Sequence, residues 1–150
     1  MRLLAVVASK HGSTWEVGEA VADELRAAGH DVDLAAPAEA PEPDGYDALV
    51  LGSATYMMRW MNALNAWVEG HAEAVARTPH AVFSVGLAGG QAVLADALHP
   101  RSERTFAGKL DLEALSQVER TAVTEGESAD FRDFETIRAW ARTLPEVLTD

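Results

Sequence analysis

Cysteine is absent from this 150-residue sequence, and its absence excludes several kinds of chemistry. Without thiols the chain forms no disulfide, ligates no iron–sulfur cluster, binds no zinc through cysteine and has no thiolate nucleophile. The histidines show no metal-ligand spacing, and we therefore predict no metal site. They are His11, His30, His71, His80 and His99. Any redox chemistry of this protein must depend on a bound cofactor.

Basic residues are scarce. Lys and Arg together number 12 against 24 Asp and Glu, which gives a net charge of −12 at pH 7, and Lys10 and Lys109 are the only lysines. This balance argues against nucleic acid, whose phosphates require a basic footprint, and against an anionic membrane surface. Acidity is compatible with simple solubility, our first interpretation, and also with a basic redox partner.

Long apolar runs are also missing. No stretch approaches the roughly 20 apolar residues that a membrane-spanning helix requires. The run from Leu3 to Ala8 is too short for a signal peptide and leads into Ser9–Gly12 without a cleavage pattern, so we expect a cytoplasmic protein. With 48% hydrophobic residues, the chain can bury one core but is too short for two ordinary domains. A single domain over residues 1–150 is predicted.

Apolar runs of strand length alternate with segments of helical spacing. Strands are predicted at residues 3–8, 31–35, 47–52, 80–85 and 104–107, and helices at 13–28, 60–76, 91–98, 111–120 and from 133 onward. The three prolines between Pro37 and Gly45 predict a loop. The alternation predicts an α/β fold, a doubly wound five-stranded parallel sheet of order 2-1-3-4-5 between two helical layers. Such a sheet binds ligands at the carboxyl ends of its first and third strands.

The loop after the first predicted strand opens a helix and combines hydroxyls with one glycine. It consists of Ser9, Lys10, His11, Gly12, Ser13 and Thr14. Unpaired backbone N–H groups, a positive helix dipole, hydroxyl donors and a glycine are what a phosphate group requires. The simpler alternative is an ordinary helix cap, because Ser and Thr favour that position. The loop matches neither G-x-x-x-x-G-K-[ST] nor G-x-G-x-x-G, and the second absence disfavours a dinucleotide.

Two further loops reach the same edge of the predicted sheet. The loop after the third strand offers small residues and then aromatic and thioether side chains, which suit a flat heteroaromatic ligand. It contains Ser53, Ala54, Thr55, Tyr56, Met57, Met58 and Trp60. The alternative is that Trp60 and the methionines only pack the start of the next helix. The loop after the fourth strand either presents its backbone to a ligand or forms a flexible turn, and it contains Gly86, Leu87, Ala88 and Gly89.

Together the three loops describe a phosphate clamp, a planar platform and a backbone-lined edge, which is the shape of a flavin mononucleotide (FMN) site. The chain resembles the flavodoxin superfamily, whose phosphate loop has the form [ST]-x-T-G-x-T and here reads S-K-H-G-S-T. It looks closest to the flavodoxin-domain proteins grouped with menaquinone-dependent protoporphyrinogen oxidase. The segments that carry this resemblance are Ser9–Thr14, Gly52–Tyr56, Phe106–Asp111 and Asp130–Ala141.

The resemblance implies that FMN is held noncovalently. Ser9, Thr14 and the backbone N–H groups of residues 10–13 would bind the phosphate, and residues 54–57 and 86–89 would bracket the isoalloxazine ring. Two departures stand out. Members of this branch often have a glycine soon after the tyrosine, where Met57 and Met58 stand and either crowd the flavin or pack on it. The stretch from residue 90 to 104 is shorter than usual, which leaves the substrate class open.

We expect an FMN-binding redox protein that either carries electrons between partner proteins or acts as an FMN-dependent oxidoreductase on a quinone or small-molecule acceptor. The alternative is a flavodoxin-fold binding or regulatory module that has lost FMN. No hydrolase site is expected, because Ser53 and Ser84 lack a G-x-S-x-G elbow. We interpret Asp130, Asp133 and Glu135 as the charged start of the last helix.

Overall fold

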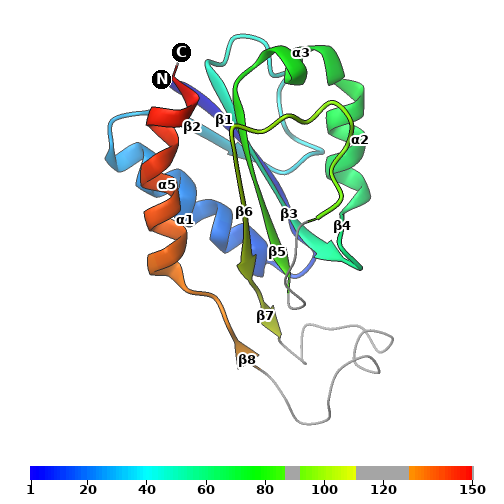
Figure 1. The fold of residues 1–150 in the computed structure, drawn as a ribbon, viewed down its shortest axis with the longest axis vertical. Coiled ribbons are helices and arrows are strands. Elements are labelled where there is room, and N and C mark those ends of the chain that lie inside the picture. Colours follow the sequence, from blue (N-terminus) through cyan, green and yellow to red (C-terminus); the bar gives the residue numbers. More distant parts are fainter. Residues whose placement is uncertain (87–91, 111–128, 150) are drawn as a thin grey trace.

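A computed structural model describes residues 1–86, 92–110 and 129–149 of the chain. Its centre is a parallel sheet with strands in the order β2-β1-β3-β5-β6 (Figure 1). These strands are β1 (Arg2–Ala8), β2 (Asp31–Ala35), β3 (Ala48–Tyr56), β5 (His80–Gly86) and β6 (Ser102–Ala107). The short β4 (Arg59–Trp60) pairs antiparallel with β3 and lies off this path. Without β4, the strands β5 and β6 are the fourth and fifth strands of the prediction, so the predicted doubly wound sheet of order 2-1-3-4-5 is confirmed.

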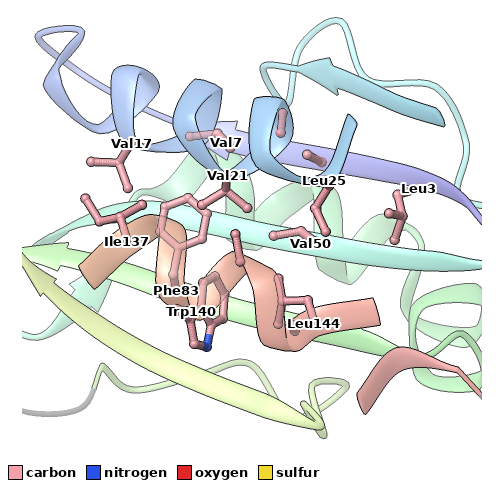
Figure 2. Packing of buried hydrophobic residues seen from close by; sticks show 14 of the residues in the cluster. Leu3, Val7, Val17, Val21, Leu25, Val50, Phe83, Ile137, Trp140 and Leu144 are labelled. Atoms are coloured by element: carbon pink, nitrogen blue, oxygen red, sulfur yellow. The ribbon is translucent and has the colours of Figure 1, made fainter. Parts of the chain in front are cut away.

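Helices cover both faces of the sheet (Figure 1). One face carries α1 (Ser13–Ala27) and α5 (Phe134–Leu148), and the other carries α2 (Asn62–Gly70) and α3 (Ala72–Arg77). Figure 2 shows the first of the two cores, in which Val21 of α1 and Leu144 of α5 meet Val50 and Phe83 of the sheet. Successive residues of β1 alternate between the two cores, so the strand is apolar at every position inside it. None of the described helices is both long and apolar enough to cross a membrane.

One close approach between β3 and β5 requires a glycine. A Cβ atom on Gly52 would lie 2.0 Å from the ring of Phe83, closer than unbonded atoms can come. The Phe83 ring is held from its other sides, with ring centroids 6.0 Å from Trp140 and 6.2 Å from Phe106. Because these aromatic rings pack edge to face or tilted, Phe83 has little freedom to move aside.

Three predicted elements differ from the structure. The third strand continues to Tyr56, beyond the predicted end at Gly52, because it turns back and pairs with β4. The helix predicted at 60–76 is β4 followed by α2 and α3, with a break at His71, whose backbone angles (φ −125°, ψ 26°) are not helical. Gly70 precedes this break, and glycine is a poor helix former.

The helix predicted at 91–98 is wrong for residues 92–98, which form a turn and an isolated bridge. The Val93 N–H donates to the Met58 carbonyl (2.8 Å), so a distant segment takes the backbone group that a helix would have used. The helix predicted at 111–120 lies outside the described residues. A second, small sheet of β7 (Lys109–Leu110) and β8 (Ala129–Asp130) had no signal in the periodicity.

We expect Gly52→Ala to lower the free energy of unfolding by about 1–3 kcal/mol, as overpacked cores do, because its new methyl group overlaps Phe83. Gly70→Ala is the matched control, since a Cβ there meets no atom within 4 Å. Urea denaturation of both variants measures the difference. Equal stabilities of the two variants would show that the Phe83 ring moves aside without cost.

Candidate functional site

The carboxyl ends of β1, β3 and β5 lie level with one another, and this places three loops at one edge of the sheet. Ala8 is in register with Ser53, and Ser53 with Ser84. The β1 strand ends at this level, and β3 and β5 continue only a few residues past it, to Tyr56 and Gly86. The loop Ser9–Gly12, the β3–β4 hairpin and Gly86 meet at the edge where parallel sheets bind ligands.

The first turn of α1 is left without a side-chain cap. Gly12 is the N-cap residue and has a left-handed backbone (φ 87°), and no side chain bonds the first N–H groups. The first helical bond of the cap runs from the Glu16 N–H to the Gly12 carbonyl (3.1 Å), so the amides of residues 13–15 precede it. The simpler interpretation of this loop, a hydroxyl that caps the helix, is therefore wrong. Three amides that precede the first helical bond, at a positive dipole end, suit an anion.

Loop hydroxyls flank this helix start. The Gly12 N–H donates to Ser9 Oγ (3.1 Å), a bond that uses a lone pair of the hydroxyl and not its hydrogen. Thr14 lies on the inner side of the first turn and is only 2% exposed. Lys10 is exposed and His11 is half-buried, and Lys10 Nζ lies 5.7 Å from the centroid of the Tyr56 ring. The side chains of Lys10 and Tyr56 thus bring together the loop after the first predicted strand and the loop after the third.

The β3–β4 hairpin turns at Met57 and Met58. Both have positive φ angles (52° and 65°), although neither is glycine. A two-residue turn with two positive φ values matches the right-handed twist of the strands it joins, but it usually contains asparagine and glycine. The Met57 side chain is 96% exposed and that of Met58 49%, so neither is drawn into the core. The backbone at this turn is strained.

Buried hydrogen bonds beneath the hairpin hold it in this conformation. Ser53 Oγ accepts from the Met61 N–H (3.0 Å) and donates to the Ala54 carbonyl (2.7 Å). Trp60 Nε1 donates to Ser84 Oγ (2.8 Å) in a buried contact. The Ser53 hydroxyl, a predicted ligand group, is therefore committed to the hairpin. Trp60 packs in the core, so the alternative interpretation of this loop holds for Trp60 and not for the exposed Met57 and Met58.

The loop after β5 begins in close contact with the hairpin. A Cβ on Gly86 would lie 2.3 Å from Thr55 Oγ1, and that hydroxyl donates to the Val85 carbonyl (3.3 Å). Gly86 must therefore lack a side chain for Thr55 to hold the two loops together. Leu87, Ala88 and Gly89, the rest of the predicted ring-binding segment, lie outside the described residues.

Sequence reasoning missed one residue at this edge, Arg132. Its side chain is only 5% exposed, and Nη1 donates to the Ser13 carbonyl in the first turn of α1 (3.1 Å). Nε and Nη2 donate to the two carboxylate oxygens of Asp130 (2.9 and 2.8 Å). These bonds lower the pKa of Asp130 to about 2. Arg132 lies in the segment Asp130–Ala141 that carries the family resemblance, but the sequence assigned no role in the site to it.

The interpretation as a charged helix start holds for Asp133 and not for Asp130. Asp133 is the N-cap of α5 and accepts from the Thr136 N–H (3.1 Å), which lowers its pKa. Asp130 instead belongs to β8 and binds Arg132. No group of three or more metal-binding side chains occurs in the part of the chain that the structure describes.

Comparisons with known proteins agree with this arrangement. The family model described as a flavodoxin domain matches residues 4–129. The chain belongs to this flavodoxin-domain family. No curated protein matches the sequence.

Solved flavodoxins share the fold over their whole length. An oxidised flavodoxin 1 from Bacillus cereus is 14% identical, with a TM-score of 0.65, and the match covers 99% of this chain and 100% of that one. A flavodoxin from the domain Archaea is 12% identical, with a TM-score of 0.62 over 98% and 99% of the two chains. The flavodiiron protein from Giardia intestinalis is 15% identical, with a TM-score of 0.62 over 98% of this chain and 35% of its own. At these identities the likeness shows the fold alone.

FMN is the cofactor that membership of this family indicates. The residues of the edge fit it: the uncapped first turn of α1 offers amide donors to a phosphate, and the exposed hairpin lies beside it. The dinucleotide-type glycine loop is absent from the sequence, in agreement with a mononucleotide.

The double variant Met57→Asn with Met58→Gly should raise the free energy of unfolding of the cofactor-free protein by about 1 kcal/mol, because both residues then tolerate positive φ. Thermal and urea unfolding measure the change. Met57→Ala with Met58→Ala is the control, since it removes the same side chains but keeps the unfavourable φ. If the alanine pair stabilises as much, side-chain exposure and not backbone strain is the cause.

Proposed function

We propose that this flavodoxin-domain protein is an FMN-dependent electron carrier that places the FMN phosphate on the first turn of α1. The observation that carries the proposal is the uncapped helix start behind Gly12, with Ser9 and Thr14 beside it. A helix that begins without any side-chain cap keeps several backbone donors available to an anion. Noncovalent FMN brings such an anion.

We assign two groups of residues to the cofactor. The hydroxyls of Ser9 and Thr14 and the backbone N–H groups of residues 10–13 bind the phosphate, and the Thr14 N–H, which precedes the first helical bond, joins them. The Gly12 N–H gives up its bond to Ser9 Oγ to do so. Residues 54–57 and 86–89 bracket the isoalloxazine ring. The level strand ends support this division, because they bring the two groups to one edge of the sheet.

Bound FMN supplies the redox chemistry, and the chain's own residues bind and orient it. The bond from Thr55 Oγ1 to the Val85 carbonyl holds the two ring-binding loops together, and Ser53 and Trp60 anchor the hairpin from below. The net charge of −12 disfavours additional negative charge on a bound group and so lowers its reduction potential.

The exposed surface of the hairpin favours a carrier over a substrate-specific enzyme. Tyr56 is 44% exposed, and Met57, Met58 and Val93 are exposed with it. An electron carrier must present its cofactor edge to a redox partner, whereas an oxidoreductase needs a substrate pocket over the ring. The second candidate is an oxidoreductase of the protoporphyrinogen-oxidase-like branch acting on a quinone or other small acceptor, and its support is the set of sequence motifs.

Loss of FMN is the competing possibility, because Met57 and Met58 stand where related chains often have a glycine. The visible spectrum of the purified protein decides the matter. A yellow protein that releases FMN on denaturation supports the proposal. A colourless protein that takes up no added FMN overturns it in favour of a binding or regulatory module.

FMN should raise the melting temperature more than riboflavin does, because only FMN carries the phosphate. At an FMN concentration one hundred times the dissociation constant of FMN, the stabilisation is about 2.7 kcal/mol, and riboflavin at the same concentration should give less. Thr14→Val preserves shape and removes the hydroxyl donor, so FMN should bind roughly tenfold more weakly, with little change in the cofactor-free protein. Thr78→Val, at the far end of α3, is the control. Equal rises in melting temperature with FMN and with riboflavin would show that the phosphate does not bind to this loop.

Tyr56→Ala tests the ring platform. Since Tyr56 is half exposed and not buried under a helix, the variant should keep the stability of the cofactor-free protein. FMN should bind more weakly and fluoresce more brightly when bound, because a stacked ring quenches flavin emission. Tyr46→Ala is the control, because the only other tyrosine precedes β3 at the opposite edge of the sheet. Unchanged affinity and emission in Tyr56→Ala would move the platform to other residues.

A further inference from the structure

Arg132 reaches from the segment before α5 into the first turn of α1. Its guanidinium is nearly buried and has three protein partners: Asp130, Glu16 and the Ser13 carbonyl. The ring of Phe134 lies against it, 5.0 Å from the guanidinium carbon. Surface arginines that only add solubility have no such enclosure, so the placement of this group needs a reason.

The geometry points to Arg132 as a positioning residue for the bound phosphate, one that acts through the peptide group joining Ser13 and Thr14. This inference rests on the proposed function, because it presumes that the phosphate lies on the first turn of α1. Arg132 is placed on the carbonyl side of that peptide, and the phosphate lies on the N–H side.

The link between the two sides is a single peptide group. Arg132 Nη1 donates to the Ser13 carbonyl oxygen at 3.1 Å, and the N–H of the same peptide belongs to Thr14. A cation bonded to a carbonyl polarises the peptide and makes its N–H a stronger donor. The Thr14 amide is one of those that precede the first helical bond, so it is the donor an anion would meet.

Geometry and not net charge distinguishes this role. Asp130 binds Nε and Nη2 in a two-point contact and leaves Nη1 directed at Ser13. Glu16, with an oxygen 3.4 Å from Nη1, adds a second negative charge, so the cluster of these three side chains is not cationic overall. A planar fork can hold Asp130 and Ser13 at once, whereas a lysine ammonium cannot reproduce that arrangement.

The test compares two arginines that both bind α1, Arg132 in the segment before α5 and Arg142 within α5. Arg142 binds Glu24 near the far end of α1, at 2.6 Å, and makes no contact with the first turn. Arg132→Gln, Arg132→Lys and Arg142→Gln are titrated with FMN and with riboflavin. The Thr14 amide proton is followed by nuclear magnetic resonance in each cofactor-free variant.

We expect Arg132→Gln and Arg132→Lys to weaken FMN binding roughly tenfold, with riboflavin affinity unchanged. The Thr14 amide signal should move upfield in both, because the peptide is less polarised. Arg142→Gln should alter neither. Asp130→Asn is a milder variant, and it should give a smaller change in the same direction.

Equal losses of FMN and riboflavin would show a general structural role and overturn the inference, as would an unmoved Thr14 signal together with unchanged FMN affinity. Wild-type FMN affinity in Arg132→Lys would show that a positive charge alone is enough and that the geometry of the guanidinium is not needed. If wild-type protein binds no FMN, the proposed function fails. Inorganic phosphate titrated against the Thr14 signal then decides whether Arg132 still directs an anion to this turn.

Discussion

The burial of β1, β3 and β5 on both faces is the constraint on which the rest of this protein depends. Side chains from α1 and α5 close one side of these strands and those of α2 close the other, so the strands cannot slide past one another without moving two cores. Their register sets the level at which three loops begin. A glycine at position 52 leaves room for the ring of Phe83, its partner in the register of β3 and β5.

The site at that edge combines unsatisfied and strained backbone. The helix α1 begins without a side-chain cap, which a helix tolerates only when packing along the rest of its length holds it in place. The hairpin has two non-glycine residues with positive φ. Buried bonds from Ser53 and Trp60 stabilise it, as does the bond from Val93 to Met58. Backbone strain of this kind is typical of binding sites.

Sequence periodicity predicted the elements that have a strong repeat and missed those held by distant partners. The parallel strands and α1 were predicted within a few residues, and the central strands and α1 are apolar on the faces they bury. The β4 strand exists because it pairs with β3, and residues 92–98 form a bridge and a turn in place of a helix because Val93 bonds to the hairpin. Such contacts join residues far apart in the chain, and local spacing carries no trace of them.

The candidate site shows the same division. The residues Ser9–Thr14, their glycine and their place before a helix indicated a phosphate loop, with an ordinary helix cap as the alternative, because hydroxyls and helix amides are local features. The tertiary structure alone decided that Gly12 and not a hydroxyl begins the helix, that Ser53 is committed to the hairpin, and that Arg132 reaches Ser13. Arg132 and Ser13 are separated by more than a hundred positions in the chain. Only the packing of α5 beside α1 brings a guanidinium from one end of the sequence to a peptide near the other.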